Sequence, residues 1–316
     1  MQKSKKLNLI GQLLLLTATI VWGTSFFILK ETIEQVPAYF VIALRFLFSG
    51  VVLFFVFIKK LKTLSKKNVF QGIVIGVFVA LAYMLQTSGL KYTSPGRNAF
   101  LTSTYCVMCP FIVWLLYKKK PMAYNVISAV ICLVGIGLIS LSGDSGGGDN
   151  SLLGEVLTVL SAIFFALQII YARRFQKDGA DTITLLIFEF LTVGVILMLS
   201  SLVLELPKCG IKGYAINLEQ GVNIAYLALT CTLFAQSAQM IGQKYTTTSQ
   251  SALILSLESV FGMFFSVLFG AEKLSVMLGV GFAVVFVAVL INELEFDVTK
   301  LFLRHASPSK EQKNKQ

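Results

Sequence analysis

The stretch LILSLESVFGMFFSVLFGAEKL, from Leu253 to Leu274, decides the fold class of this sequence. Its apolar run is long enough to cross a bilayer as a helix, which needs about 20 residues. Glu258 nevertheless lies well inside that run. A carboxylate there costs about 2.5–3.5 kcal/mol on insertion scales unless it faces protein or water. The rest of the chain must therefore supply an interior for Glu258 to face.

The composition of the whole chain agrees with a membrane protein. Of its 316 residues, 56% are hydrophobic and only 14% are charged, whereas soluble domains carry about 25% charged residues. The formal charge of +11 would suggest a nucleic-acid partner for a soluble protein. Here the basic residues lie in short clusters between apolar runs, a pattern that sets membrane topology. We therefore expect an all-α integral membrane protein with no nucleic-acid partner.

Ten apolar segments of roughly 20 residues are predicted to cross the membrane as helices. Short polar connections separate them. The predicted spans are about Leu9–Leu29, Ala38–Ile58, Val69–Leu90, Asn98–Tyr117, Met122–Leu141, Leu152–Tyr171, Thr182–Leu204, Gly221–Ile241, Ser251–Gly270 and Ser275–Ile291.

The distribution of Lys and Arg predicts the orientation. If the N-terminus is cytoplasmic, 20 of the 27 basic residues fall on the cytoplasmic side and 6 outside, with Arg45 inside the second span. Cytoplasmic loops of membrane proteins carry an excess of Lys and Arg. Both termini are therefore predicted to be cytoplasmic, in a multi-pass protein of the cell membrane.

An internal repeat relates the two halves of the chain. LKYTSPGRNAFLTS (Leu90–Ser103) parallels QKYTTTSQSALILS (Gln243–Ser256) at an offset of 153, and a weaker match places Gly11 on Gly154. Because five spans are an odd number, the second copy is expected to run upside down through the membrane. Inverted repeats are typical of secondary transporters with a site between the halves. The predicted organisation is a cytoplasmic N-terminus (1–8), a first repeat (9–141), a Gly-rich linker (142–151), a second repeat (152–291) and a cytoplasmic polar tail (292–316).

Five predicted spans carry a stripe of polar residues, because their spacings return to the same side of a helix. Such stripes would be costly against lipid, so we expect them to point inward. Any single residue is equally explained by an interhelical hydrogen bond, worth about 0.6 kcal/mol on average. Five stripes together favour a hydrated or substrate-lined cavity. They are Thr17, Thr24 and Ser25; Tyr83 and Gln86; Asn98, Thr102 and Tyr105; Ser161 and Gln168; and Gln236, Gln239 and Gln243.

Three charged residues, Arg45, Glu189 and Glu258, lie about seven residues inside predicted spans, and ionisable residues within the membrane are functional by default. Glu258 has three open roles: it contacts substrate, carries a proton or ties two helices together. For Arg45 and Glu189 we favour structural roles, since each lies near a span end and its side chain can extend toward water. The sequence match places Glu189 one residue beyond the repeat partner of Arg45.

No enzyme motif or cofactor site is predicted. His305, the single histidine, lies in the polar tail, so the sequence offers neither a catalytic triad nor a zinc site. Cys106 and Cys109 form a C-x-x-C, but inside a predicted span. Gly146–Gly148 are flanked by aspartates that would repel phosphate. We expect no cofactor and no metal.

Three sequence motifs resemble a known family. IVWGTSFF (Ile20–Phe27) resembles the first-helix motif of the drug/metabolite transporter (DMT) superfamily, EamA type, and the opening stretch resembles its ninth-helix motif. PFIVWLLYKKKP (Pro110–Pro121) resembles the equivalent segment of the first repeat. Ser259 stands where the family often has proline, and Lys118–Lys120 replaces a usual Gly-Glu-Arg.

The resemblance covers Leu9 to about Ile291 and implies ten helices in two inverted five-helix repeats around a central cavity. By position, it implies that the substrate-binding residues are Trp22, Thr24, Ser25, Tyr83, Gln86, Tyr105, Gln168, Gln236, Gln239 and Glu258.

We therefore expect a secondary transporter that moves a small amino-acid-like metabolite out of the cell by alternating access. Its expected partners are the substrate, the lipid bilayer and protons as a candidate coupling ion. Two alternatives stay open. One is a nucleotide-sugar carrier of the same superfamily, for which only Arg45 and Arg97 offer basic cavity residues. The other is a membrane scaffold or receptor that acts through the polar tail. Substrate identity and oligomeric state do not follow from these residues.

Overall fold

The computed structural model describes residues 2–59, 65–141, 151–246, 248–270 and 275–293. These residues form helices and no strand. Nearly all of the predicted linker and polar tail lies outside the described residues. The helices are α1 (Gln2–Ile33), α2 (Ala38–Val56), α3 (Lys66–Leu90), α4 (Pro95–Thr102), α5 (Tyr105–Tyr117), α6 (Ala123–Leu141), α7 (Ser151–Lys177), α8 (Thr182–Leu204), α9 (Leu206–Cys209), η2 (Ile211–Tyr214), α10 (Leu218–Tyr226), η3 (Leu227–Phe234), α11 (Ala235–Tyr245), α12 (Thr248–Leu268) and α13 (Val276–Glu293).

Seven helical segments are long and apolar enough to cross a membrane, and three shorter apolar helices accompany them. Two of the seven segments are interrupted. The segment Pro95–Tyr117 joins α4 to α5, and Leu218–Tyr245 joins α10, the π-helix η3 and α11. Large apolar side chains on the outer surface, such as Leu115, Leu133 and Val203, are about 70% exposed, as expected for residues that face lipid.

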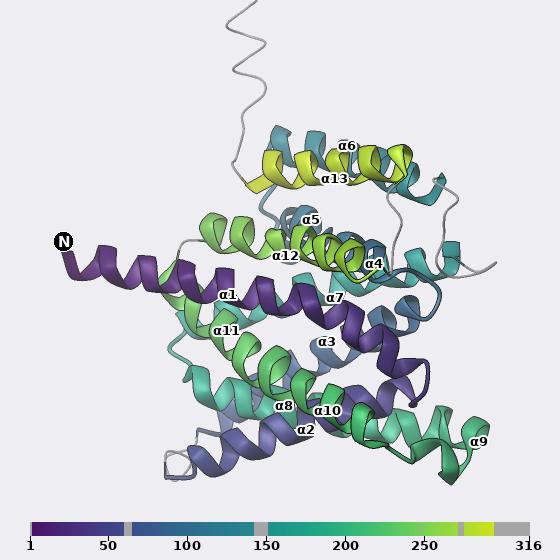
Figure 1. The fold of residues 1–316 in the computed structure, drawn as a ribbon. Helices are drawn as coiled ribbons and strands as arrows, with labels where there is room; N and C mark the ends of the chain where they lie inside the picture. The colour runs from purple at the N-terminus through teal and green to yellow at the C-terminus, as the bar shows by residue number, and fades with distance from the viewer. Residues whose placement is uncertain (1, 60–64, 142–150, 247, 271–274, 294–316) are drawn as a thin grey trace, which may run out of the picture.

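The helix packing repeats itself when the two halves of the chain are exchanged. Helix α2 packs on α8, and α6 packs on α13; Figure 1 shows these two pairs at opposite edges of the bundle. Between them, α1 packs on α11 and α12, while its counterpart α7 packs on α3, α4 and α5. When the two repeats are exchanged, the contacts of α1 become those of α7, and the contacts of α7 become those of α1. The fold is therefore a two-repeat helical bundle.

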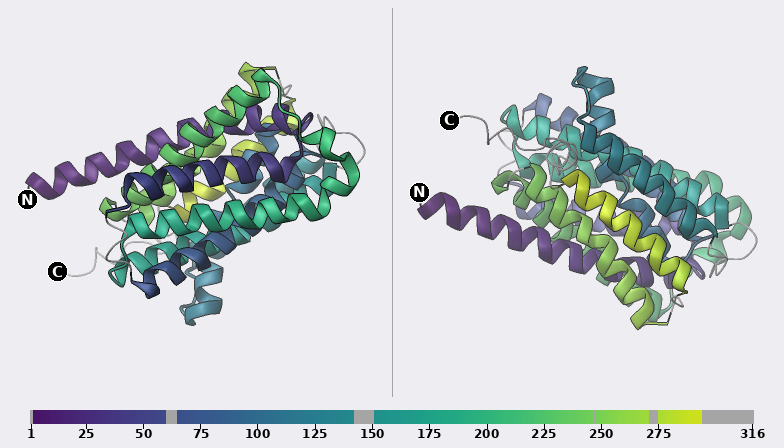
Figure 2. Two further views of the ribbon diagram at one scale, coloured as in Figure 1. Left: turned by 90° about the horizontal axis from the view of Figure 1, so that it is seen from below. Right: turned by 90° about the horizontal axis from the view of Figure 1, so that it is seen from above.

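The ends of α1 and α7 show the relative direction of the repeats. A Cβ atom on Gly11, near the start of α1, would lie 3.0 Å from the carbonyl oxygen of Gly242, near the end of α11. A Cβ atom on Gly154, near the start of α7, would lie 2.8 Å from the carbonyl oxygen of Gly89, near the end of α3. Lys30, near the end of α1, donates to the last carbonyl of α3 at 2.8 Å. Helix α1 thus ends where α7 begins. The axes of the long helices are aligned with one another, whichever way the chain runs along them (Figure 2).

Helices α2 and α8 are equivalent at a shift of 144 residues, the separation of Gly50 and Gly194, which each press against a leucine of the other helix. The buried positions of the two helices also coincide at this shift. Arg45 is therefore the equivalent of Glu189. The placement of Glu189 one residue beyond this position, taken from the weaker sequence match, is corrected by the packing.

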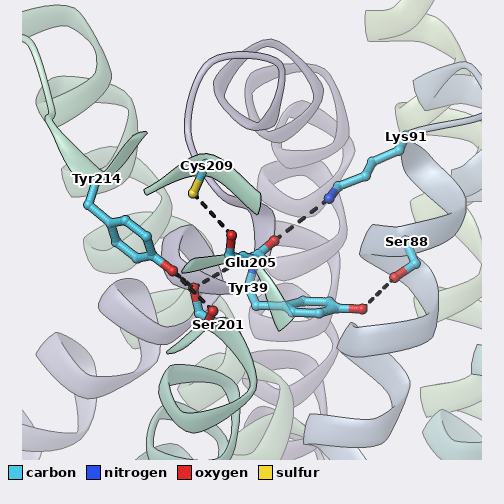
Figure 3. A network of polar contacts seen from close by, with 7 residues as sticks. All are labelled: Tyr39, Ser88, Lys91, Ser201, Glu205, Cys209 and Tyr214. Carbon is cyan, nitrogen blue, oxygen red and sulfur yellow. Dashed lines mark hydrogen bonds and ion pairs between the residues drawn. The ribbon is translucent and has the colours of Figure 1, made fainter. Parts of the chain in front are cut away.

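Glu205 links the two repeats at the end of the molecule where α1 finishes (Figure 3). Its carboxylate accepts from the backbone N–H of Tyr39 at 3.1 Å and from the Ser201 hydroxyl at 2.8 Å, and the Lys91 ammonium lies 3.7 Å away. Tyr39 lies in the first turn of α2, where backbone N–H groups lack intrahelical partners and a negative charge is favourable. The carboxylate therefore fixes the start of α2 against the end of α8.

The close crossing of α3 and α7 gives a stability prediction. An alanine Cβ at Gly89 would lie 2.4 Å from Thr158 Oγ1 and 2.6 Å from the Gly154 carbonyl oxygen. We expect Gly89→Ala to lower the free energy of unfolding by about 1–3 kcal/mol, the usual cost of overpacking, measured by thermal unfolding in detergent. Gly137→Ala is the control, because no neighbouring atom lies within 4 Å of a Cβ there. An equal loss in both variants would contradict the packing described here.

Candidate substrate-binding cavity

A cavity is bordered by residues of both repeats and encloses about 570 Å³ of space between atoms, part of which is open to solvent. Two apolar clusters pack around it: one is built mainly on α1, α2, α3 and α8, the other on α4 to α7, α12 and α13. Phe165 of α7 packs against both clusters. The lining residues are Trp22, Ser25, Phe26, Leu29, Arg45, Tyr83, Gln86, Thr102, Tyr105, Phe165, Gln168, Ile169, Gln236, Gln239 and Glu258.

The structure brings nine of the ten predicted substrate-binding residues to this one cavity: Trp22, Ser25, Tyr83, Gln86, Tyr105, Gln168, Gln236, Gln239 and Glu258. Thr24 lies outside the lining, where its hydroxyl makes a 2.7 Å hydrogen bond with that of Tyr226. Thr17, expected to point inward, is exposed on the outer surface and bonds its own helix, donating to the Leu13 carbonyl.

Of the other stripe residues, Asn98, Ser161 and Gln243 are buried but do not line the cavity. Asn98 instead donates to Thr158 Oγ1 at 2.7 Å. This is an interhelical hydrogen bond, which was the alternative explanation for a polar residue in a stripe. The stripes thus mark buried faces more reliably than they mark the cavity itself.

Glu258 faces the cavity from α12 and is 8% exposed. No hydrogen bond or ion pair joins its carboxylate to another residue in the described part of the chain. It interacts electrostatically with the hydroxyls of Tyr83 and Tyr105. The next residue, Ser259, donates to the Ser256 carbonyl at 2.7 Å, and α12 continues through this point without a break. The carboxylate is therefore available to a ligand.

Arg45 also lines the cavity, although we expected a structural role near the span end. Its side chain is 1% exposed, so it does not extend toward water, and the same holds for Glu189 at 0%. The guanidinium donates from Nε to Thr232 Oγ1 at 2.6 Å and lies 5.3 Å from the centre of the Tyr83 ring. Among the described residues, no carboxylate lies within ion-pair distance of it. The sequence of α2 is apolar on all sides, so the inward placement of Arg45 follows from the packing of α2 against α8.

The Tyr83 hydroxyl lies near both charged residues of the cavity and interacts electrostatically with Arg45 and with Glu258. Carboxamides and aromatic rings complete the lining. Trp22 is fixed by a 2.8 Å hydrogen bond from its indole N–H to the Cys231 carbonyl, and Gln86 donates to Thr102 Oγ1 at 3.0 Å. The site thus offers one cation, one carboxylate, amide donors and acceptors, and flat apolar surfaces.

The irregular helix η3 holds part of this site. A π-helix leaves wider hydrogen-bonded turns, and such turns are frequent at functional sites. Thr232, which accepts from Arg45, donates to the carbonyl of Leu227 five residues earlier at 3.0 Å. The equivalent helix of the first repeat, α3, is a regular α-helix. The two repeats therefore differ in the helix that holds the lining residues Trp22 and Arg45 in place.

Arg97 does not join the cavity. It is 1% exposed, and its Nη1 lies 3.2 Å from Glu155 Oε1, which is 3% exposed. This pair joins the start of α4 to the start of α7, at the same end of the molecule as Lys91 and Glu205. No group of three or more His, Cys, Asp or Glu that could hold a metal is found in the described residues.

The two tryptophans, Trp22 and Trp114, allow the placement of the cavity to be tested without a known ligand. Trp22 is 8% exposed inside the bundle and Trp114 is 44% exposed on its outer surface. We expect brominated lipids to quench the fluorescence of Trp22→Phe protein, which retains Trp114, and to leave Trp114→Phe protein nearly unquenched. Equal quenching of both proteins would show that Trp22 is open to lipid.

Comparisons with known proteins agree with this architecture. The model of the EamA-like transporter family matches residues 9–141 and 152–293. An uncharacterised transporter of Archaeoglobus fulgidus is 30% identical over 287 residues, covering 91% of this chain and 87% of the relative. YedA, an uncharacterised inner membrane transporter of Escherichia coli K12, is 23% identical over 283 residues, covering 87% and 88%. A crystal structure with 18% identity and a TM-score of 0.65, covering 94% of this chain and 99% of the other, shares the fold.

The family is one of transporters, and its model covers both repeats of the bundle described above. This multi-span membrane protein therefore belongs to the EamA-like transporter family.

Proposed function

We propose that the protein is a secondary transporter that exports a small amino-acid-like metabolite across the plasma membrane by alternating access. The observation that carries this proposal is the interior cavity, which residues of both repeats line and which holds one cation and one unpaired carboxylate. Transporters with inverted repeats bind substrate near the bilayer midplane, between the halves. The ten residues predicted to bind substrate remain a proposal, with Thr24 the weakest member.

The charges of the lining support a zwitterionic substrate. The Arg45 guanidinium, which always carries its charge, suits the carboxylate of a ligand, and Glu258 suits its ammonium. The carboxamides of Gln168 and Gln239 add neutral donors and acceptors, and the ring of Trp22 offers apolar surface for a side chain.

The topology proposed for this mechanism has ten spans. Seven helical segments meet the length and hydropathy of a span, and the apolar helices α6, α12 and α13 supply three more. We propose that both termini are cytoplasmic, as the Lys and Arg distribution predicts. Under this topology the Glu205 and Arg97 ion pairs lie on the outer side, where they hold the repeats together while the cavity exchanges with the cytoplasm.

The nucleotide-sugar alternative receives less support, because a diphosphate asks for several cavity cations. Arg45 is the one Lys or Arg among the described residues of the lining, and Arg97 is held by Glu155. The scaffold alternative depends on the polar tail, which lies outside the described residues.

Flux through proteoliposomes tests the proposed function. Wild-type protein is expected to move at least one member of a panel of radiolabelled amino acids and related small metabolites. Glu258→Gln should lower that flux about tenfold, because a charge-assisted hydrogen bond contributes about 1.5–3 kcal/mol and each 1.4 kcal/mol is a factor of ten. Gln239→Ala should lower it about fivefold, since a neutral hydrogen bond contributes about 1 kcal/mol.

Thr17→Ala is the matched control for these variants, because Thr17 lies on the outer surface and away from the cavity. It should transport like the wild type. All variants are first compared by size-exclusion chromatography to show that they are folded. Unchanged flux in both cavity variants would contradict the site assignment, and absence of flux across the whole panel would contradict the function.

A further inference from the structure

Glu189 of α8 is a buried carboxyl that substrate binding does not use. It is fully buried at 0% exposure and does not line the cavity. Its Oε1 accepts a 2.9 Å hydrogen bond from Gln236 Nε2, while its Oε2 is buried without a hydrogen-bond partner among the described residues. A buried carboxylate with one oxygen unsatisfied is costly. The position therefore suits a carboxyl that carries a proton for part of its working cycle.

The charges around the cavity support the same view. Arg45 is a permanent cation, and one ionised carboxyl, that of Glu258 in the cavity lining, is enough to balance it. An ionised Glu189 would add a second negative charge, and the described residues of the lining include no further cation to balance it. Glu258 borders the cavity, where water can hydrate it, whereas Glu189 is sealed in the bundle. Of the two carboxyls, Glu189 is therefore the one that gains more from a bound proton.

The helices packed against α8 are α2, α3, α9 and α11. The charged or titratable groups that they direct toward this region are Arg45 on α2 and Tyr83 on α3; α11 presents the neutral Gln236. Lys208 and Cys209 of α9 follow the far end of α8, more than four turns away. Beyond these helices, Cys231 of η3 and Glu258 of α12 interact electrostatically with the Tyr83 hydroxyl, as do Arg45 and Glu189. Of the groups that border the cavity, the Tyr83 hydroxyl lies close enough to Glu189 to interact with it electrostatically.

Gln236 provides the direct connection between Glu189 and the cavity, because it lines the cavity and bonds the carboxyl at the same time. A carboxamide has a donor side and an acceptor side. With an ionised Glu189, Gln236 must turn its NH₂ group toward the carboxylate. A protonated Glu189 has an O–H that can donate to the carboxamide oxygen, which turns the NH₂ group away. Protonation would therefore change the hydrogen-bonding groups that Gln236 offers to a ligand.

We propose that Glu189 binds and releases the proton that is coupled to transport, and that it acts on the cavity through Gln236; this inference rests on the transport function proposed above. The proton is taken from water when rocking of the repeats opens the contact between α8 and α11. It returns to water on the other side after the opposite movement. Glu189 is in this view a positioning and proton-carrying residue, while Glu258 contacts the substrate.

Infrared difference spectroscopy of the purified protein in nanodiscs tests proton binding without any substrate. Spectra recorded in acidic and alkaline buffer should differ in the C=O stretch of a protonated carboxyl. We expect this band to disappear in Glu189→Gln protein and to shift in Gln236→Ala protein, in which the hydrogen-bond partner is lost. Glu219→Gln is the matched control, because it makes the same change on an exposed residue of α10. A band that persists unchanged in Glu189→Gln protein, or that is absent from the wild type, would overturn the proposal.

Transport of a radiolabelled mixture of amino acids under an imposed pH gradient gives the second readout. The wild type should accumulate label with the gradient, whereas Glu189→Gln should exchange label across the membrane yet accumulate none. Glu258→Gln should instead lower the exchange itself about tenfold. Accumulation by Glu189→Gln equal to that of the wild type, or wild-type flux that ignores the gradient, would overturn the proton-carrying role while leaving the transport function intact.

Discussion

The structure depends on one constraint: an ionisable group away from water has to be paired, hydrated or neutralised. Arg45, Glu189 and Glu258 meet this constraint in three ways. Arg45 donates to Thr232 and lies over the Tyr83 ring, Glu258 faces the cavity, and Glu189 accepts from Gln236. The cavity lined from both repeats gives Arg45 and Glu258 a polar surface to face inside the bundle, and it is also the place where we propose that a polar substrate binds.

The pseudo-symmetry of the repeats makes the asymmetry of the site informative. Exchange of the halves places Arg45 on Glu189, two opposite charges at equivalent positions of α2 and α8. Both side chains nevertheless bind the same broken helix, Arg45 at Thr232 and Glu189 at Gln236, one turn apart. A symmetric bundle would have divided these contacts between α3 and the helix η3–α11. The second repeat has thus been specialised around the site, and its π-helix is part of that difference.

Much of the fold could be predicted from the sequence, because apolar segment length and the charge pattern respond directly to the bilayer. Polar stripes predicted lining residues such as Gln86 and Gln239, because polar side chains are costly against lipid and turn inward. Thr17 shows the limit of that logic, since a threonine can satisfy its hydroxyl within its own helix and face lipid. Arg45 shows another limit: its distance from the span end suggested a path to water, and only the packing of α2 against α8 reveals that its side chain turns inward.

Arg45 and Glu258 are proposed to recognise a zwitterion together, and thermal stabilisation of the purified protein tests this recognition most directly. Each amino acid that raises the melting temperature is compared with its N-acetyl derivative, which lacks the ammonium, and its carboxamide, which lacks the carboxylate. Both derivatives should fail to stabilise the wild type. If the N-acetyl and carboxamide forms stabilise it as well as the parent amino acid, recognition by these two charges is contradicted.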